Sequence, residues 1–300
     1  MALRSPFRSS SISQNPSLKV NVLFLLAHIH SLTNSSSKNK VLHSFKKPLE
    51  RSPLAKFLKE NCRSGNFTLN EALYFFYYMI NSRPICPILS FTTLFSALAK
   101  KKHYYELISL YKRLNSTGLS PDLVSLTVLI NCFCNIKRVS NGFAVFGGIL
   151  KKGFSTDAVT FTCLIKGLCV ESKFRGSMEL FKKMVAVGFR PTVITYGTLI
   201  DGSCKTGKIN VAIKLHEEMT KGKEESGVIC MPNVVIYNTM IDGLCKDGLI
   251  EKARQLFLEM KGLGISADAV TYTSLIHGLC CVGYWENDKS LFEKFLGMKT

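Results

Sequence analysis

The amino-acid sequence predicts an all-α protein, a right-handed α-solenoid superhelix of about seven helix-turn-helix repeats. Two observations lead to this fold class. A segment such as residues 270–276 (Val-Thr-Tyr-Thr-Ser-Leu-Ile) recurs, and successive copies from Val124 onward start 35, 35, 41 and 35 residues apart. A fixed period of this size is typical of stacked helical repeats. Within each period, apolar residues also recur at helical spacing in two separate stretches.

The first fifty residues differ in composition from the rest of the chain. They contain several Lys and Arg residues and many Ser residues, but the first acidic residue is Glu50. A basic, Ser-rich segment without acidic residues is typical of an organelle transit peptide. We therefore expect residues 1–50 to be a disordered transit peptide for the mitochondrion or, alternatively, the chloroplast. A secretory signal built on the apolar patch 22–27 and a plain disordered tail are the competing interpretations.

The remaining residues, 51–300, are expected to form one array of repeated units. The recurring segment begins at the second residue of each unit, and this alignment sets the boundaries. The units are 51–87, 88–122, 123–157, 158–192, 193–233, 234–268 and 269–300. The first unit is degenerate and the last is truncated.

Each unit is expected to hold two helices joined by a turn. In unit 234–268, Tyr237 and Ile241 share one apolar face, and a second apolar face runs through residues 253–260. Gly248 separates the two stretches. Isolated helices of about 13 residues are marginal in water, so each pair must bury its apolar faces against neighbouring pairs. One helix of each pair is expected to line the concave side of the solenoid.

Six of the eleven cysteines occupy the twelfth position of a unit. They are Cys62, Cys134, Cys169, Cys204, Cys245 and Cys280. Equivalent positions in successive units face the same way and lie one repeat apart, which is too far for a disulfide. We therefore expect small apolar side chains that pack between helix pairs, with a metal site or a disulfide as the minor alternative. The chain is expected to bind no metal and no other cofactor.

One segment of the sequence resembles a catalytic motif. Residues 202–208 (Gly-Ser-Cys-Lys-Thr-Gly-Lys) are close to a phosphate-binding loop, but Ile209 stands where Ser or Thr holds magnesium. The segment also follows a helical stretch, whereas a phosphate-binding loop follows a strand. We therefore expect no enzymatic activity.

The charge of the chain points to a polyanionic partner. The net charge is +18, from 39 Lys and Arg against 21 Asp and Glu residues. Such an excess favours nucleic acid ahead of an acidic membrane surface. No run of eighteen apolar residues occurs, so we expect no membrane insertion.

Several segments resemble the pentatricopeptide repeat (PPR). They are residues 118–122, 235–248, 253–260 and 270–280. With the 35-residue period, the resemblance extends over residues 51–300. The lack of variant units and of C-terminal extensions is similar to the P subclass of the family. Residues 102–104, 129–134 and 221–230 resemble the restorer-of-fertility-like group of plant organelle proteins.

The resemblance implies sequence-selective binding of single-stranded RNA, one base per unit, in the processing, stability or silencing of organelle transcripts. In the family, the fifth and the last side chains of a unit together recognise a base edge. These pairs are Thr92 with Asp122, Thr127 with Asp157, Thr162 with Thr192, Gly197 with Asn233 and Asn238 with Asp268, and Thr273 has no partner in the sequence. The implied RNA site is 5′-G-G-purine-N-U-purine-3′.

Two further sets of residues are implied to contact RNA. The second residue of a unit inserts between neighbouring bases, and these residues are Leu89, Val124, Val159, Ile194, Val235 and Val270. An ordinary core role is the alternative, because one aliphatic face per helix is expected in any case. The thirteenth residue contacts phosphate, and it is Lys at Lys100, Lys205 and Lys246. The helix macrodipole also favours Lys near a helix end, so this position has an explanation without RNA.

Two other functions compete with RNA binding. A peptide-binding helical-repeat scaffold has a similar architecture, although the 35-residue period argues against it. A truncated array without independent function is the other, because the sequence stops at Thr300 within an expected second helix and before a polar capping helix. As an RNA-binding protein, the chain is expected to be a monomer whose partners are single-stranded RNA and a recruited nuclease or other organelle protein.

Overall fold

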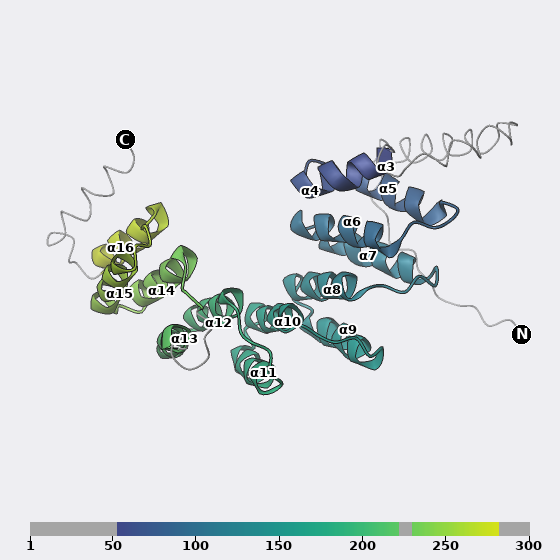
Figure 1. Ribbon diagram of the computed structural model, residues 1–300. Coiled ribbons are helices and arrows are strands. Elements are labelled where there is room, and N and C mark those ends of the chain that lie inside the picture. Colours follow the sequence, from purple (N-terminus) through teal and green to yellow (C-terminus); the bar gives the residue numbers. More distant parts are fainter. Residues whose placement is uncertain (1–52, 222–229, 282–300) are drawn as a thin grey trace, which may run out of the picture. The chain divides into compact units, whose positions relative to one another are not determined.

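The computed structural model describes residues 53–221 and 230–281 (Figure 1). The expected transit peptide over residues 1–50 lies outside the described residues, as does the last unit beyond residue 281. The chain divides into two compact parts, Met1–Lys56 and Phe57–Thr300. In the first part the described element is the short helix α3 (Pro53–Lys56).

Every element in the described residues of the second part is helical. In chain order they are the π-helical turn η2 (Phe57–Asn61), α4 (Cys62–Ser64), α5 (Leu69–Asn81), α6 (Ile88–Lys100), α7 (Tyr104–Asn115), α8 (Leu123–Asn135), α9 (Val139–Lys151), α10 (Ala158–Val170), α11 (Phe174–Ala186), α12 (Val193–Lys205), α13 (Ile209–Lys221), α14 (Val234–Lys246), α15 (Ile250–Gly262) and α16 (Ala269–Cys281). The prediction of an all-α fold is therefore confirmed.

The helices form pairs along the chain, and the pairs stack on one another. Helix α8 packs against α9, its partner across a short turn, and against α10, the first helix of the next pair. The same pattern holds for α10 with α11 and α12, and for α14 with α15 and α16. Because each pair covers the apolar faces of its sequence neighbours, the predicted α-solenoid of helix-turn-helix repeats is confirmed. Its handedness stays a prediction.

The residue before the first helix of a unit caps that helix in α8, α10, α12, α14 and α16, whereas Pro87 before α6 makes no side-chain cap. Asp122 accepts a hydrogen bond from the backbone N–H of Ser125 at 2.8 Å, and Asn233 accepts one from Ile236 at 3.1 Å. Three more helices are capped in this way, by Asp157, Thr192 and Asp268. Such a cap contributes about 1 kcal/mol to helix stability. The last residue of a unit therefore starts the first helix of the next unit.

The turn within a helix pair uses a left-handed backbone. Gly248 has a φ of 75° and separates α14 from α15, as predicted, and Gly207 has a φ of 68° between α12 and α13. The segment 202–208 that resembles a phosphate-binding loop therefore consists of the end of α12 and this turn. It follows a helix and lacks the strand-to-helix geometry of a nucleotide site.

Cysteines at the twelfth position pack against glycines of the following unit. A Cβ atom added at Gly202 would lie 2.6 Å from the Sγ of Cys169, and one added at Gly243 would lie 2.7 Å from the Sγ of Cys204. The same arrangement joins Cys134 with Gly167 and Cys245 with Gly278. The predicted packing between helix pairs is confirmed for these four cysteines. Burial raises the pKa of the Cys204 thiol to about 12, so the thiol stays protonated at neutral pH.

The two outer cysteines of this series differ from each other. Cys62 is buried, and burial raises the pKa of its thiol to about 12. Cys280 is exposed near the end of α16, where no following unit is described. The prediction that this position packs between helix pairs is therefore wrong for Cys280, whose side chain no described helix pair covers.

Candidate nucleic-acid interface

The second residue of each first helix is an exposed aliphatic side chain. The exposed fractions are 68% for Leu89, 56% for Val124, 59% for Val159, 72% for Ile194, 64% for Val235 and 57% for Val270. These residues stand near the start of α6, α8, α10, α12, α14 and α16. Core residues are buried, so the alternative that these are ordinary core residues is wrong. The surface carries one apolar side chain per unit at a constant position.

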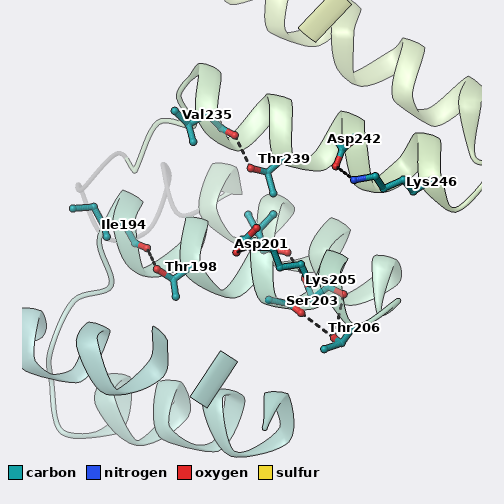
Figure 2. A network of polar contacts seen from close by, with 12 residues as sticks. Ile194, Thr198, Asp201, Ser203, Lys205, Thr206, Val235, Thr239, Asp242 and Lys246 are labelled. Carbon is teal, nitrogen blue, oxygen red and sulfur yellow. Dashed lines mark hydrogen bonds and ion pairs between the residues drawn. The ribbon is translucent and has the colours of Figure 1, made fainter. Parts of the chain in front are cut away.

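Each exposed aliphatic residue begins a row along its helix, as Figure 2 shows for α12 and α14. Spacings of four, three and four residues place the members on one helical face. The rows are Ile194, Thr198, Asp201 and Lys205 in α12, and Val235, Thr239, Asp242 and Lys246 in α14. Within each row the threonine hydroxyl donates to the carbonyl of the aliphatic residue, at 2.7 Å in α12 and 2.8 Å in α14. These two rows therefore have an apolar end and a charged end, whereas the corresponding last positions in α8, α10 and α16 are Asn135, Val170 and Cys281.

The three lysines expected to contact phosphate are exposed but not equivalent. Lys205 Nζ lies 2.7 Å from Asp201 Oδ2, and Lys246 Nζ lies 2.6 Å from Asp242 Oδ2. The hydrogen bond to Asp242 raises the pKa of Lys246. In α6 a serine takes the place of the aspartate, and Lys100 forms no ion pair with a described residue. Lys205 and Lys246 therefore each share their charge with a carboxylate.

A basic groove lies beside the first of the expected base-reading residues. It has a volume of about 560 Å³ and is lined by η2, α4 and α6. Lys59, Arg63 and Lys100 supply its positive charge, and Thr92 and Thr93 lie in its wall. The groove therefore combines phosphate-binding chemistry with a hydroxyl from a predicted reading position.

Two of the expected base-reading pairs are joined by direct hydrogen bonds. The Thr92 Oγ1 lies 3.1 and 3.0 Å from the two carboxylate oxygens of Asp122. The Asn238 Nδ2 donates to Asp268 Oδ1 at 2.9 Å. Hydrogen bonds from the Thr271 backbone N–H and from Asn238 help to hold the pKa of Asp268 below its ordinary value, so this carboxylate stays ionised. The structure thus brings the fifth and last residues of these units together.

Two other pairs are linked through a third residue. Thr127 Oγ1 lies 3.0 Å from Thr160 Oγ1, and the Thr160 hydroxyl donates to Asp157 at 2.7 Å. In the next unit Thr162 Oγ1 lies 2.9 Å from Thr195 Oγ1, which lies 3.1 Å from Thr192 Oγ1. The linking residue is in each case the third residue of the following unit.

The remaining expected positions are not brought together. Gly197 has no side chain to bond Asn233, and a Cβ added at Gly197 would meet the Cγ1 of Ile236 at 3.4 Å. The Thr273 hydroxyl donates to its own helix, at the carbonyl of Ala269, at 2.7 Å.

The sequence analysis did not identify the third residue of a unit as a partner of the base-reading pair in the preceding unit. Four units carry a hydroxyl there that contacts the preceding fifth residue: Ser125, Thr160, Thr195 and Thr271. All four residues are completely buried. The available signal was a Ser or Thr directly after the exposed aliphatic residue in the recurring segment.

The described residues offer no other obvious type of site. No cluster of His, Cys, Asp or Glu side chains suited to a metal ion occurs among them. None of their helices is long and apolar enough to cross a bilayer. The exposed aliphatic residues on the first helices are the feature of the surface that recurs from unit to unit in this part of the chain.

Family models match most of the array. The model of the PPR repeat family matches residues 121–170, 156–205 and 232–281, and that of the PPR repeat matches residues 89–119, 194–223 and 270–298. Together these matches cover more than half of the chain.

Two relatives from Arabidopsis thaliana match part of the chain. The mitochondrial pentatricopeptide repeat-containing protein At1g12300 is 36% identical over 91 residues, which are 30% of this chain and 14% of the relative. The pentatricopeptide repeat-containing protein At1g06580 is 42% identical over 84 residues, which are 27% of this chain and 17% of the relative. The match thus spans less than a fifth of either relative.

Solved structures resemble this chain in fold. The pentatricopeptide repeat protein PPR10 from maize has a TM-score of 0.56 and 19% identity, over 96% of this chain and 43% of PPR10. PPR10 in complex with an 18-nt psaJ RNA element has a TM-score of 0.53 at 19% identity, over 96% of this chain and 44% of PPR10. At this level of identity the similarity concerns the fold alone.

Proposed function

Because this chain belongs to the pentatricopeptide repeat family, we propose that it binds single-stranded RNA with sequence selectivity, one base per unit. One observation carries the proposal: an exposed aliphatic residue recurs at a constant position beside a polar cluster, in unit after unit. Aliphatic side chains offer contact to base faces, and polar groups on rigid helices offer hydrogen bonds to base edges. The net charge of +18 suits a phosphate backbone.

The polar pairs fit different base edges. Asp122 and Asp157 are carboxylates that only accept hydrogen bonds, and the guanine edge offers two N–H donors. Asn238 both donates and accepts, which suits the mixed edge of uracil. The Thr162 hydroxyl donates to the carbonyl of Ala158 at 2.7 Å and so faces a base as an acceptor, whereas the Thr192 hydroxyl can act in either sense, so this pair discriminates weakly. The proposed site is therefore 5′-G-G-purine-N-U-purine-3′, with Thr273 at its last position.

We propose mitochondrial transcripts as the target, because relatives such as At1g12300 are named as mitochondrial proteins. The protein is proposed to be a P-subclass, restorer-of-fertility-like member that acts as a monomer. It occupies its transcript, and either shields the RNA or recruits a nuclease or another organelle protein. In this account the chain supplies binding and selectivity and performs no catalysis of its own.

The test is binding of the full chain to a short RNA that contains G-G-A-N-U-A, compared with a scrambled RNA at two salt concentrations. The expected result is a preference of about 100-fold that persists at the higher salt, because several base contacts of about 1–3 kcal/mol are lost on scrambling. Equal binding of both RNAs, weakening together with salt, would mean that charge alone holds the RNA. Binding of peptides in place of RNA would support the scaffold alternative.

Asp242→Asn is expected to strengthen RNA binding by about threefold at low salt. The substitution removes the carboxylate that lies 2.6 Å from Lys246 Nζ, so the lysine charge becomes available to a phosphate. One additional phosphate contact would steepen the slope of log affinity against log salt by about 0.7. The measurement is a salt titration of binding. Glu179→Gln is the matched control, because Glu179 pairs with Arg175 on the second helix α11. Equal slopes for both variants would show that Lys246 does not contact the RNA backbone.

A further inference from the structure

A buried hydroxyl from the following unit belongs to each complete base-reading cluster. We propose that the third residue of a unit is a positioning residue, which fixes the direction of the hydrogen bonds in the preceding pair and thereby its base preference. The inference rests on the proposed RNA binding and extends it to residues that cannot touch RNA. Ser125, Thr160, Thr195 and Thr271 are completely buried, so they act only through their neighbours.

In the cluster around Thr160, the donor and the acceptor of each hydrogen bond can be assigned. Its backbone N–H donates to Asp157 Oδ1 at 2.8 Å, and its hydroxyl donates to the same oxygen at 2.7 Å. A hydroxyl carries one proton, and that of Thr160 is directed at Asp157. In the 3.0 Å hydrogen bond between Thr127 and Thr160, the Thr127 hydroxyl must therefore be the donor. Both Thr127 and Asp157 then face a base as acceptors. This arrangement favours guanine, whose Watson–Crick edge offers two N–H donors.

The cluster at Ser125 leads to the same result by a different route. The Thr92 hydroxyl lies 3.0 and 3.1 Å from the Asp122 carboxylate and 3.1 Å from the Ile88 carbonyl, and both groups can only accept. The Ser125 hydroxyl lies 2.7 Å from Thr92 and therefore donates to it. Thr92 and Asp122 again present acceptors, in agreement with a guanine at the first position.

The cluster at Thr271 sets the orientation of an amide. Asp268 accepts from Asn238 Nδ2 at 2.9 Å, and the Thr271 hydroxyl donates to Asn238 Oδ1 at 2.5 Å. The Thr271 hydroxyl also lies 3.1 Å from Asp268 Oδ1, but a flipped amide would place the Asn238 oxygen against the Asp268 carboxylate, where neither group has a proton to donate. The orientation is therefore fixed, and Asn238 keeps one N–H for an acceptor on the base. Uracil offers such acceptors at O2 and O4.

The fourth cluster lacks two of its three members. Gly197 has no side chain, and Ile236 places an aliphatic group where the other units have a hydroxyl. The Ile236 side chain is buried. Asn233 accepts a hydrogen bond from the Ile236 backbone N–H at 3.1 Å, which caps α14 and does not involve the side chain of Ile236. The fourth base therefore meets an apolar surface, and no hydrogen-bond donor or acceptor is fixed there by a buried hydroxyl. We expect no preference among the four bases at this position.

The first test compares Thr160→Val with Thr160→Ser in the full chain. The probe is the G-G-A-N-U-A RNA with G or U at its second base. The wild type is expected to prefer G about tenfold. Thr160→Val should reduce this preference to about twofold or less, and Thr160→Ser should retain it. Selectivity at the first and fifth bases should not change in either variant. A merely structural role would instead weaken all positions together.

The control carries the same chemical change away from the proposed interface. The Thr220 hydroxyl bonds carbonyls of its own second helix, α13, so Thr220→Val should leave every base preference intact. If Thr160→Val keeps the wild-type preference at the second base, the inference is wrong although the proposed function stands. If the wild type ignores the second base, the proposed function fails and the inference fails with it.

The second test introduces the missing hydroxyls into the fourth cluster. Gly197→Thr combined with Ile236→Thr reproduces the Thr162–Thr195 arrangement, and it should create a preference of about fivefold among the four bases at the fourth position. Gly197→Thr alone should create none, because Ile236 offers no hydrogen bond. A single variant that selects as well as the double variant would overturn the positioning role.

Discussion

Gly167→Ala is expected to lower the free energy of unfolding by about 2 kcal/mol. A Cβ added to Gly167 in α10 would lie 2.8 Å from the Cys134 Cβ and 2.9 Å from the Val139 Cγ2. Both neighbours are buried, and rotation about χ1 cannot move the Cβ of Cys134 away. The stacked helix pairs must therefore separate. This cost exceeds the gain of about 0.5–1 kcal/mol that alanine brings to a helix interior.

The matched control is Gly147→Ala in α9. A Cβ added there meets no atom within 4 Å, so only the helix propensity changes and the variant should gain about 0.5–1 kcal/mol. Urea unfolding followed by circular dichroism measures both changes. Combining Cys134→Gly with Gly167→Ala should recover part of the loss, because it removes the opposing side chain. If Gly167→Ala is as stable as Gly147→Ala, the packing of cysteine against glycine does not hold the units together.

Thr127→Asn is expected to change the preference at the second base from G to U. The fifth, last and following third residues of this unit are Thr127, Asp157 and Thr160, and the uracil-reading unit has Asn238, Asp268 and Thr271. The one substitution therefore reproduces a complete second cluster, including its buried threonine. The ratio of affinities for G and U at this base should change by at least about 20-fold, because two contacts of about 1–3 kcal/mol exchange their base.

Competition between two RNAs that differ only at the second base measures this ratio. Thr220→Asn on the second helix α13 controls for the chemical change and should leave the ratio at its wild-type value. A change of preference at the first or third base would mean that the units and bases are aligned differently. An unchanged ratio would mean that the fifth residue does not contact the base.

The fold was predictable from sequence because the same pattern of apolar residues recurs in unit after unit. The 35-residue period and the two apolar stretches within it located the helices, and Gly248 marked the turn between α14 and α15. The exposure of Val124 or Ile194 was not predictable in the same way. An aliphatic residue in a helix fits either a core or a surface, and only the packing of neighbouring pairs decides between them.

The positioning hydroxyls were harder to foresee than the reading pairs. Ser125 and Thr92, or Thr160 and Thr127, lie 33 residues apart and meet only because successive units stack. The Asp242–Lys246 pair had a plain signal, since residues four apart share a helical face. This ion pair lowers the expected strength of a phosphate contact by Lys246. The presence of a lysine at the thirteenth position does not by itself indicate this effect.

Base-by-base replacement in the G-G-A-N-U-A RNA tests the central claim most directly. Each position is changed in turn to the other three bases, and binding to the full chain is measured at one salt concentration. The account predicts strong preferences for G at the first and second bases and U at the fifth, a weak purine preference at the third, and no preference at the fourth. Equal binding across all replacements would contradict the assignment of one base to each unit.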